Sequence, residues 1–158
     1  MNPRRSILIV FGVALLFPAT RLAFGQANDP LVGAWLLSRG KSDFTPPLAF
    51  FKRTMIIDAA DGGYKCTIRT VSDRQQTFES TYTARLDGKD VPIDNSTLDT
   101  MSLRRIDANG IESTGKIKGQ AVENATMRVS ADGKVLTITT KGSLNGEEYS
   151  SIQIFNRQ

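Results

Sequence analysis

Hydrophobic and polar residues alternate along most of the chain after residue 28. In residues 77–86, for example, Phe78, Tyr82 and Leu86 fall on one face, while threonine, glutamate and arginine side chains fall on the other. This period of two is typical of an antiparallel sheet with one buried and one solvated face. No stretch after residue 28 has a compelling helical period, so the pattern predicts an all-β protein.

Turn signals divide this part of the chain into short strands. The turn dipeptides are Asp61-Gly62, Asp87-Gly88, Asn109-Gly110, Asp132-Gly133 and Asn145-Gly146, and each suits backbone positions with positive φ. The pattern predicts ten strands, at 33–38, 54–59, 64–72, 77–86, 89–93, 100–106, 111–118, 121–130, 134–141 and 147–156. Short links favour a meander, and closure would remove its two edges. We therefore predict a single antiparallel up-and-down β-barrel of 8–10 strands.

Two links break this rhythm. Residues 39–53 form a long connection in which Pro46-Pro47 favours extended backbone. This connection also carries Phe44, Phe50 and Phe51, which are expected either to cap the barrel mouth or to pack against its wall. Residues 94–99 are polar and turn-like. No repeat or second domain interrupts the pattern.

The first 27 residues have the order of a cleavable signal peptide. Arg4 and Arg5 form a basic start, residues 7–17 are almost entirely apolar, and small residues follow up to Ala27. The apolar run is shorter than the ~20 residues of a membrane-spanning helix, although an uncleaved N-terminal anchor is the alternative. We expect a signal peptide at 1–27 and a barrel domain at 28–158. The mature protein would then be periplasmic or secreted, without stable membrane insertion.

Charge and cysteine content narrow the function classes. The chain has 20 Lys+Arg and 16 Asp+Glu, and loss of the signal would leave 17 basic side chains and a net charge near +1. That balance gives no reason to expect nucleic acid, and the pairs Lys52-Arg53 and Arg104-Arg105 are expected to be solvated strand ends. Cys66 is the only cysteine, so no intramolecular disulfide can form, and we expect a small buried apolar residue there.

Three residues at the two ends of the domain resemble a family signature. Gly33-x-Trp35 on the first strand, with Arg157 after the last, is similar to the calycins, the lipocalins and fatty-acid-binding proteins with their bacterial relatives. The resemblance implies that Arg157 lies across the Trp35 ring and closes the barrel floor, a cation–π contact. Two departures stand out. The 39–53 link implies a loop or a single helical turn in place of a helical lid, and Gln153 and Phe155 replace the Arg-x-Tyr with which many fatty-acid-binding proteins hold a carboxylate.

Few residues of the sequence suit a catalytic role. The chain has no histidine, which excludes Ser-His-Asp and Cys-His catalysis and histidine ligation of haem or zinc. No glycine-rich phosphate loop is present, and the paired carboxylates sit at turns. We predict no cofactor and no metal. The chain is expected not to be an enzyme, with an isomerase or lyase built around Tyr82, Arg105 or Arg128 as the alternative.

The remaining candidate site is the barrel interior. On the period-two pattern the candidate pocket residues are Met55, Ile68, Phe78, Tyr82, Met101, Leu103, Arg105, Arg128, Tyr149 and Gln153. Arg105 shares a face with Met101 and Leu103, and Arg128 shares one with Val122, so either arginine could meet an acidic head group unless a bulge turns it outward.

These residues predict a binding function. The expected partner is a small hydrophobic or amphipathic molecule, held non-covalently in the barrel. The alternative is a filled, ligand-free barrel that acts as an interaction or inhibitor protein through its surface. The pattern leaves the oligomeric state open.

Overall fold

The computed structural model describes residues 29–47, 50 and 52–158, and the predicted signal peptide lies outside the described residues. The elements are β1 (Gly33–Leu37), the 3-10 turn η2 (Arg39–Lys41), β2 (Asp43–Thr45), β3 (Lys52–Ala60), β4 (Gly63–Val71), β5 (Thr77–Arg85), β6 (Val91–Pro92), β7 (Thr100–Asp107), β8 (Gly110–Ile117), β9 (Gln120–Val129), β10 (Val135–Leu144) and β11 (Glu147–Arg157).

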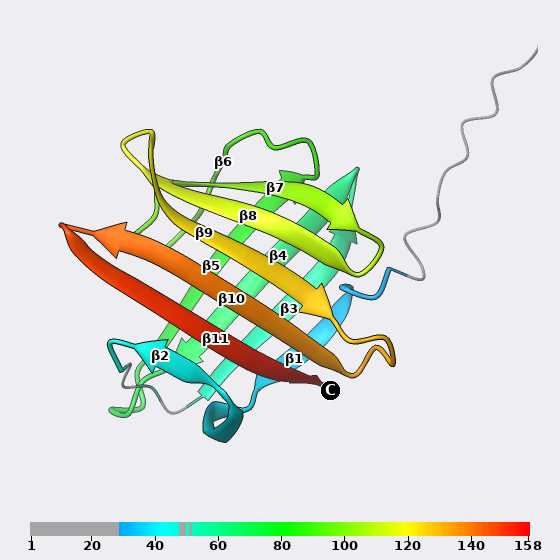
Figure 1. Ribbon diagram of the computed structural model, residues 1–158, viewed down its shortest axis with the longest axis horizontal. Helices are drawn as coiled ribbons and strands as arrows, with labels where there is room; N and C mark the ends of the chain where they lie inside the picture. Colours follow the sequence, from blue (N-terminus) through cyan, green and yellow to red (C-terminus); the bar gives the residue numbers. More distant parts are fainter. Residues whose placement is uncertain (1–28, 48–49, 51) are drawn as a thin grey trace, which may run out of the picture.

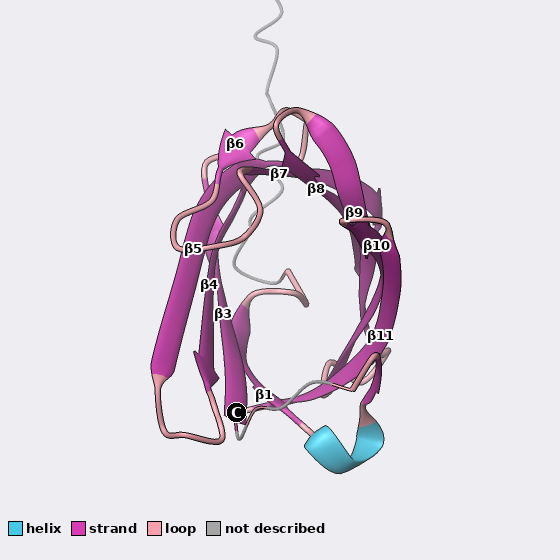
Figure 2. Cartoon of the chain, turned by 90° about the vertical axis from the view of Figure 1, so that its left-hand side faces the viewer, coloured by secondary structure: helices cyan, strands magenta, loops and turns pink. Residues whose placement is uncertain are grey.

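These strands form one antiparallel sheet that curls into a barrel. The strand order is β5-β4-β3-β1-β11-β10-β9-β8-β7-β6, so β1 joins the last strand to β3. The sheet comes round on itself where Thr81 of β5 bridges Asp94 and Asp87 bridges Arg104 of β7. Figure 1 shows β7–β11 crossing in front of β3–β5, and Figure 2 shows the strands as a ring. The predicted all-β, up-and-down antiparallel barrel is confirmed.

The long first link differs from the prediction in one respect. It begins with the single 3-10 turn η2, as expected, but it then forms β2, which pairs with β11 through Phe44 and Ser151. The expected strand at 89–93 is reduced to the two residues of β6. Both short strands lie where proline limits the backbone donors available for pairing.

The two ends of the barrel differ. At the closed end, Trp35 lies beside Arg157 in the β1–β11 ladder, and Trp35, Phe155 and Leu31 are fully buried. At the other end, which we call the mouth, lie the β10–β11 hairpin at 144–147 and the start of β3. The single thiol, Cys66, is buried in the core, as predicted.

A β-bulge interrupts the alternation of β9 at Val122. Glu123 pairs with Gly115, but the next pair joins Ala121 to Lys116, so Val122 is an extra residue in β9. Beyond the bulge, Ala125 and the other odd-numbered residues of β9 are buried, and the even-numbered ones are not. Glu123 lies on this side of the bulge and alternates regularly with Ala125, so it faces the same way as the buried residues.

Candidate functional site

A cavity of about 820 Å³ occupies the mouth half of the barrel. This volume falls within the range of small-molecule sites, roughly 300–1,000 Å³. The residues that line the cavity come from β3–β5 and β7–β11, from β2 and the proline after it, from the 93–99 loop and from the β10–β11 hairpin. They are Phe44, Thr45, Pro46, Arg53, Met55, Ile68, Tyr82, Thr97, Met101, Ser113, Glu123, Ala125, Met127, Ile138, Thr140, Leu144, Asn145, Glu147, Glu148, Tyr149, Ser150, Ser151 and Gln153.

The deep wall of this cavity is mostly apolar. Met55, Met127 and Ile138 are buried there beside the ring of Tyr82. Burial raises the pKa of the Tyr82 hydroxyl well above its usual value, and the neighbouring Cys66 adds to the shift. Tyr82 therefore stays neutral at physiological pH. An apolar body of a ligand would fit this part of the cavity.

Arg53 provides the only positive charge among the described residues of the cavity wall. Its Nε donates to Thr70 Oγ1 at 3.1 Å and its Nη1 donates to Gln153 Oε1 at 2.9 Å. Its guanidinium lies 4.7 Å from the centre of the Phe50 ring, a cation–π contact. Burial lowers the pKa of Arg53, and the negative charge of Glu123 opposes that shift. The guanidinium still remains charged, because arginine does not lose its proton in proteins.

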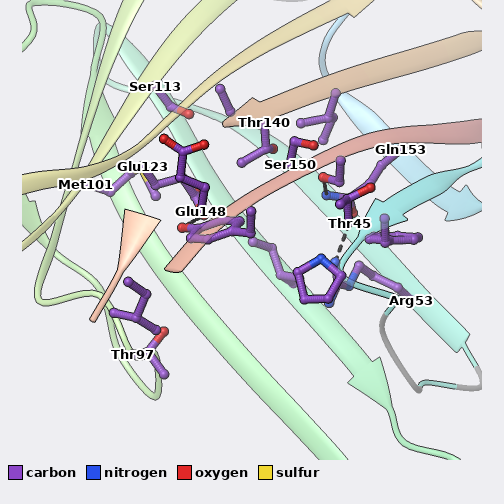
Figure 3. Close-up of a pocket in the computed structure, with 18 of the residues that line it drawn as sticks. Thr45, Arg53, Thr97, Met101, Ser113, Glu123, Thr140, Glu148, Ser150 and Gln153 are labelled. Carbon is purple, nitrogen blue, oxygen red and sulfur yellow. Dashed lines mark hydrogen bonds between the residues drawn. The ribbon is translucent and has the colours of Figure 1, made fainter. Parts of the chain in front are cut away.

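Glu123 lines the same cavity, with Tyr149 as its partner. The Tyr149 hydroxyl donates to Glu123 Oε2 at 2.8 Å, and burial followed by this carboxylate raises the pKa of Tyr149. Tyr149 pairs with Gly142 across β10 and β11, and its ring fills the space that a Cβ at Gly142 would occupy. Gly142 thus lets the ring lie flat against the wall and holds its hydroxyl at Glu123. Figure 3 shows Glu123 and Ser113 on one side of the cavity, with Arg53 and Gln153 on the other.

A second cavity, of about 270 Å³, adjoins the first at the mouth. Arg53, Glu123 and Tyr149 line both cavities. The smaller one is also lined by Phe78, which is 57% exposed, and by Leu144, which is 38% exposed. The mouth therefore has an apolar rim next to a charged band.

The closed end is sealed by Trp35 and Arg157. The Arg157 guanidinium lies 4.2 Å from the centre of the Trp35 ring, and the indole Nε1 donates to the Leu31 carbonyl at 3.0 Å. Arg157 also donates to the carbonyls of Pro30, Val32 and Gly133. At Gly33, φ is +148° and a Cβ would overlap the Arg157 guanidinium, which explains the glycine. The structure thus brings together all three residues of the predicted floor.

A polar cluster lies beside this floor. Asp29 Oδ2 accepts from the Tyr64 hydroxyl and from Arg105 Nη2, each at 2.5 Å, and Arg105 also donates to the Tyr64 oxygen. Burial opposes ionisation of Asp29, but the hydrogen bonds from Tyr64, the Leu31 backbone and Arg105 outweigh it and lower the pKa of Asp29. The N-terminal segment is therefore tied to the barrel by charge.

The predicted pocket residues fall into three groups. Six of them line the main cavity: Met55, Ile68, Tyr82, Met101, Tyr149 and Gln153. Phe78 lines only the smaller cavity at the mouth, and Leu103 is buried in the core and does not line either cavity.

The two predicted pocket arginines lie elsewhere. Arg105 faces inward, as its pattern suggested, but it lies four residues beyond Met101 toward the closed end, about 13 Å at ~3.3 Å per residue. Its partner there is Asp29. Arg128 faces outward and pairs with Asp107 at 2.8 Å. Arg128 was expected to face inward because it shares the parity of Val122. Val122, however, is the bulged residue of β9, so its parity does not indicate the inward face beyond the bulge.

Among the cavity residues that the sequence pattern missed are the two with opposite charges, Arg53 and Glu123. Arg53 was expected to be a solvated strand end, although it shares the alternation of Met55 and Ile57 and could have been found by extending the strand by one residue. Glu123 likewise shares the alternation of Ala125 and Met127, which lie on the same side of the bulge at Val122, and could have been found in the same way. Phe44 lines the cavity and Phe50 packs beneath Arg53, whereas Phe51 lies outside the described residues.

Comparisons with known proteins find a similar structure but no matching family. No family model and no curated protein matches the chain. The chain is similar to the zebrafish ileal bile acid-binding protein in a crystal structure with cholic acid, with a TM-score of 0.49 and 11% sequence identity over 82% of this chain and 99% of that chain. Within the described residues, no group of His, Cys, Asp or Glu side chains is arranged to hold a metal ion. No helix in that same part of the chain has the length and hydropathy needed to cross a membrane.

Proposed function

We propose that this protein binds a small hydrophobic or amphipathic molecule non-covalently inside the barrel. The observation that carries the proposal is the cavity of about 820 Å³, in which a buried apolar wall lies beside polar and charged side chains. Apolar surface of this kind attracts a ligand because burial removes it from water, while the polar groups orient the ligand.

The cavity favours this function over a filled barrel that acts through its surface. A filled barrel would be packed at core density along its whole length. Here the dense packing is confined to the closed half, around Trp35, Leu103 and Phe155, and the mouth half remains hollow.

The proposal extends to location and chemistry. We place the mature protein in the periplasm or outside the cell, on the basis of the signal-like residues 1–27. We assign it a carrier or sensor role rather than catalysis. Tyr82, the one tyrosine deep in the cavity, is held neutral by burial, and Arg105 and Arg128 lie away from the cavity.

A dye titration with matched variants tests the proposed site. Ser113 and Ala125 are small, buried, opposite each other in β8 and β9, and both line the cavity. The double variant Ser113→Phe/Ala125→Phe places two rings in the cavity and should weaken binding of Nile red, a neutral apolar dye, by about tenfold or more, equivalent to ~1.4 kcal/mol. The wild-type protein should bind the dye saturably with a blue-shifted emission.

The adjacent cross-strand pair supplies the control. Thr114 and Asn124 pair in the same two strands but face the outside, so Thr114→Phe/Asn124→Phe adds the same two rings away from the cavity. This variant should bind Nile red like the wild type. Equal loss in both variants, or no saturable binding by the wild type, would refute the site. Circular dichroism melts verify that each variant folds, and Ala125→Leu serves as a milder filling variant.

A further inference from the structure

The cavity wall holds two opposite charges that do not neutralise each other by direct contact. Arg53 and Glu123 line both the large and the small cavity. Among the described residues, neither side chain forms an ion pair. By contrast, Arg105 and Arg128, which lie outside the cavity, each form an ion pair with an aspartate.

Each of these two charges has hydrogen-bonding capacity left over. The contacts of Arg53 with Thr70 and Gln153 use Nε and Nη1, which leaves the two N–H groups of Nη2 without a partner in the described part of the chain. Glu123 accepts from Tyr149 through Oε2, and its Oε1 has no donor among the same residues. A planar guanidinium edge suits an anionic group, and a carboxylate oxygen suits an N–H donor.

A ligand with only one kind of head group would satisfy only half of this wall. A fully apolar ligand would strip water from both charges without replacing it, which is costly. An anionic amphiphile would pair with Arg53 but leave Glu123 unmatched. The net charge of the wall also disfavours a purely anionic ligand. Glu147 and Glu148 line the cavity as well, so with Glu123 there are three carboxylates against one guanidinium.

We propose that the ligand is a zwitterionic amphiphile, whose anionic group binds Arg53 and whose ammonium group binds Glu123. The inference rests on the proposed function and specifies its ligand class. The apolar chain lies against Met55, Met127 and Ile138, and the two head-group charges lie between Gln153 and Tyr149. Each charge of the ligand then gains a charge-assisted hydrogen bond in a site partly shielded from water.

Displacement of Nile red by chain-matched competitors tests this assignment. The competitors are dodecanol, dodecanoate, dodecylammonium and N-dodecyl-β-alanine, which carries both an ammonium and a carboxylate, each used below its micelle concentration at pH 7. The zwitterion should displace the dye at a concentration about tenfold lower than either singly charged competitor, because it makes one more charge-assisted hydrogen bond. This ranking uses only the wild-type protein, so it does not depend on how any variant folds.

Two charge-removing variants then assign the ends of the ligand. Arg53→Gln should weaken dodecanoate and the zwitterion by about tenfold and leave dodecylammonium within about twofold, and Glu123→Gln should do the reverse. Arg128→Gln and Glu112→Gln remove the same charges outside the cavity and should leave the ranking unchanged.

The outcomes separate the two proposals. If wild-type protein binds no Nile red, the proposed function itself fails. If the dye binds but dodecanol, dodecanoate or dodecylammonium competes as well as the zwitterion, the cavity remains the site and the zwitterionic assignment is overturned. The assignment is also overturned if both variants weaken all charged competitors equally.

Discussion

Substitution of Trp35 by alanine tests the floor of the barrel most severely. The indole is fully buried, donates a hydrogen bond to the Leu31 carbonyl at 3.0 Å, and stacks 4.2 Å from the Arg157 guanidinium. Truncating a buried tryptophan costs about 3–5 kcal/mol, and loss of the cation–π contact adds about 1 kcal/mol. Trp35→Ala should therefore lower the free energy of unfolding by at least about 3 kcal/mol.

Urea unfolding followed by far-ultraviolet circular dichroism measures this loss. Fluorescence is unsuitable because Trp35 is the only tryptophan. Trp35→Phe keeps an aromatic ring but leaves the Leu31 carbonyl without its donor, so it should cost an intermediate amount, about 1–3 kcal/mol. Ile152→Ala removes a large apolar side chain that is 49% exposed and should change the free energy by less than about 1 kcal/mol. An unfolding midpoint for Trp35→Ala equal to that of the wild type would refute the assignment of the floor.

Two further predictions concern titratable groups. The lowered pKa of Asp29 means that its carboxylate stabilises the fold above its unfolded pKa of about 4, and that this contribution is lost as the pH falls through the lower folded value. Asp29→Asn should cost about 2 kcal/mol in urea unfolding at pH 7 and progressively less as the pH falls below about 4; a cost independent of pH would contradict the ionic role. Burial raises the pKa of the Cys66 thiol to about 11, so a thiol reagent at pH 8 should label it slowly in the native protein and rapidly in urea, and equal rates would place the thiol at the surface.

The fold could be predicted from the sequence because its determinants are local. Alternation within strands such as β5 and the turns at Asp61-Gly62 and Asn145-Gly146 depend on neighbouring residues alone. The floor was also within reach, since Gly33 and Arg157 mark the two ends of the barrel. The strand β2 was missed because its pairing partner, Ser151, lies more than 100 positions away along the chain.

The cavity was predicted only in part, for a geometric reason. Alternation identified apolar wall residues such as Met55 and Met101, but it says nothing of how far along the barrel axis a side chain lies, so Arg105 was assigned to the cavity and not to the closed end. It also fails across a bulge, which inserts a residue and reverses the faces. Val122 lies at the bulge, so the parity that it shares with Arg128 wrongly favoured Arg128, whereas Glu123 has the parity of the buried Ala125.

Native mass spectrometry of protein purified gently from its own host, followed by organic extraction, tests the central claim most directly. The account predicts a reproducible added mass on the wild-type protein that is released into the organic phase, retained by Thr114→Phe/Asn124→Phe and absent from Ser113→Phe/Ala125→Phe. The extracted molecule should carry both an anionic and an ammonium group. A bare wild-type mass, from protein that also fails to bind Nile red, would contradict the claim that this barrel is a binding protein.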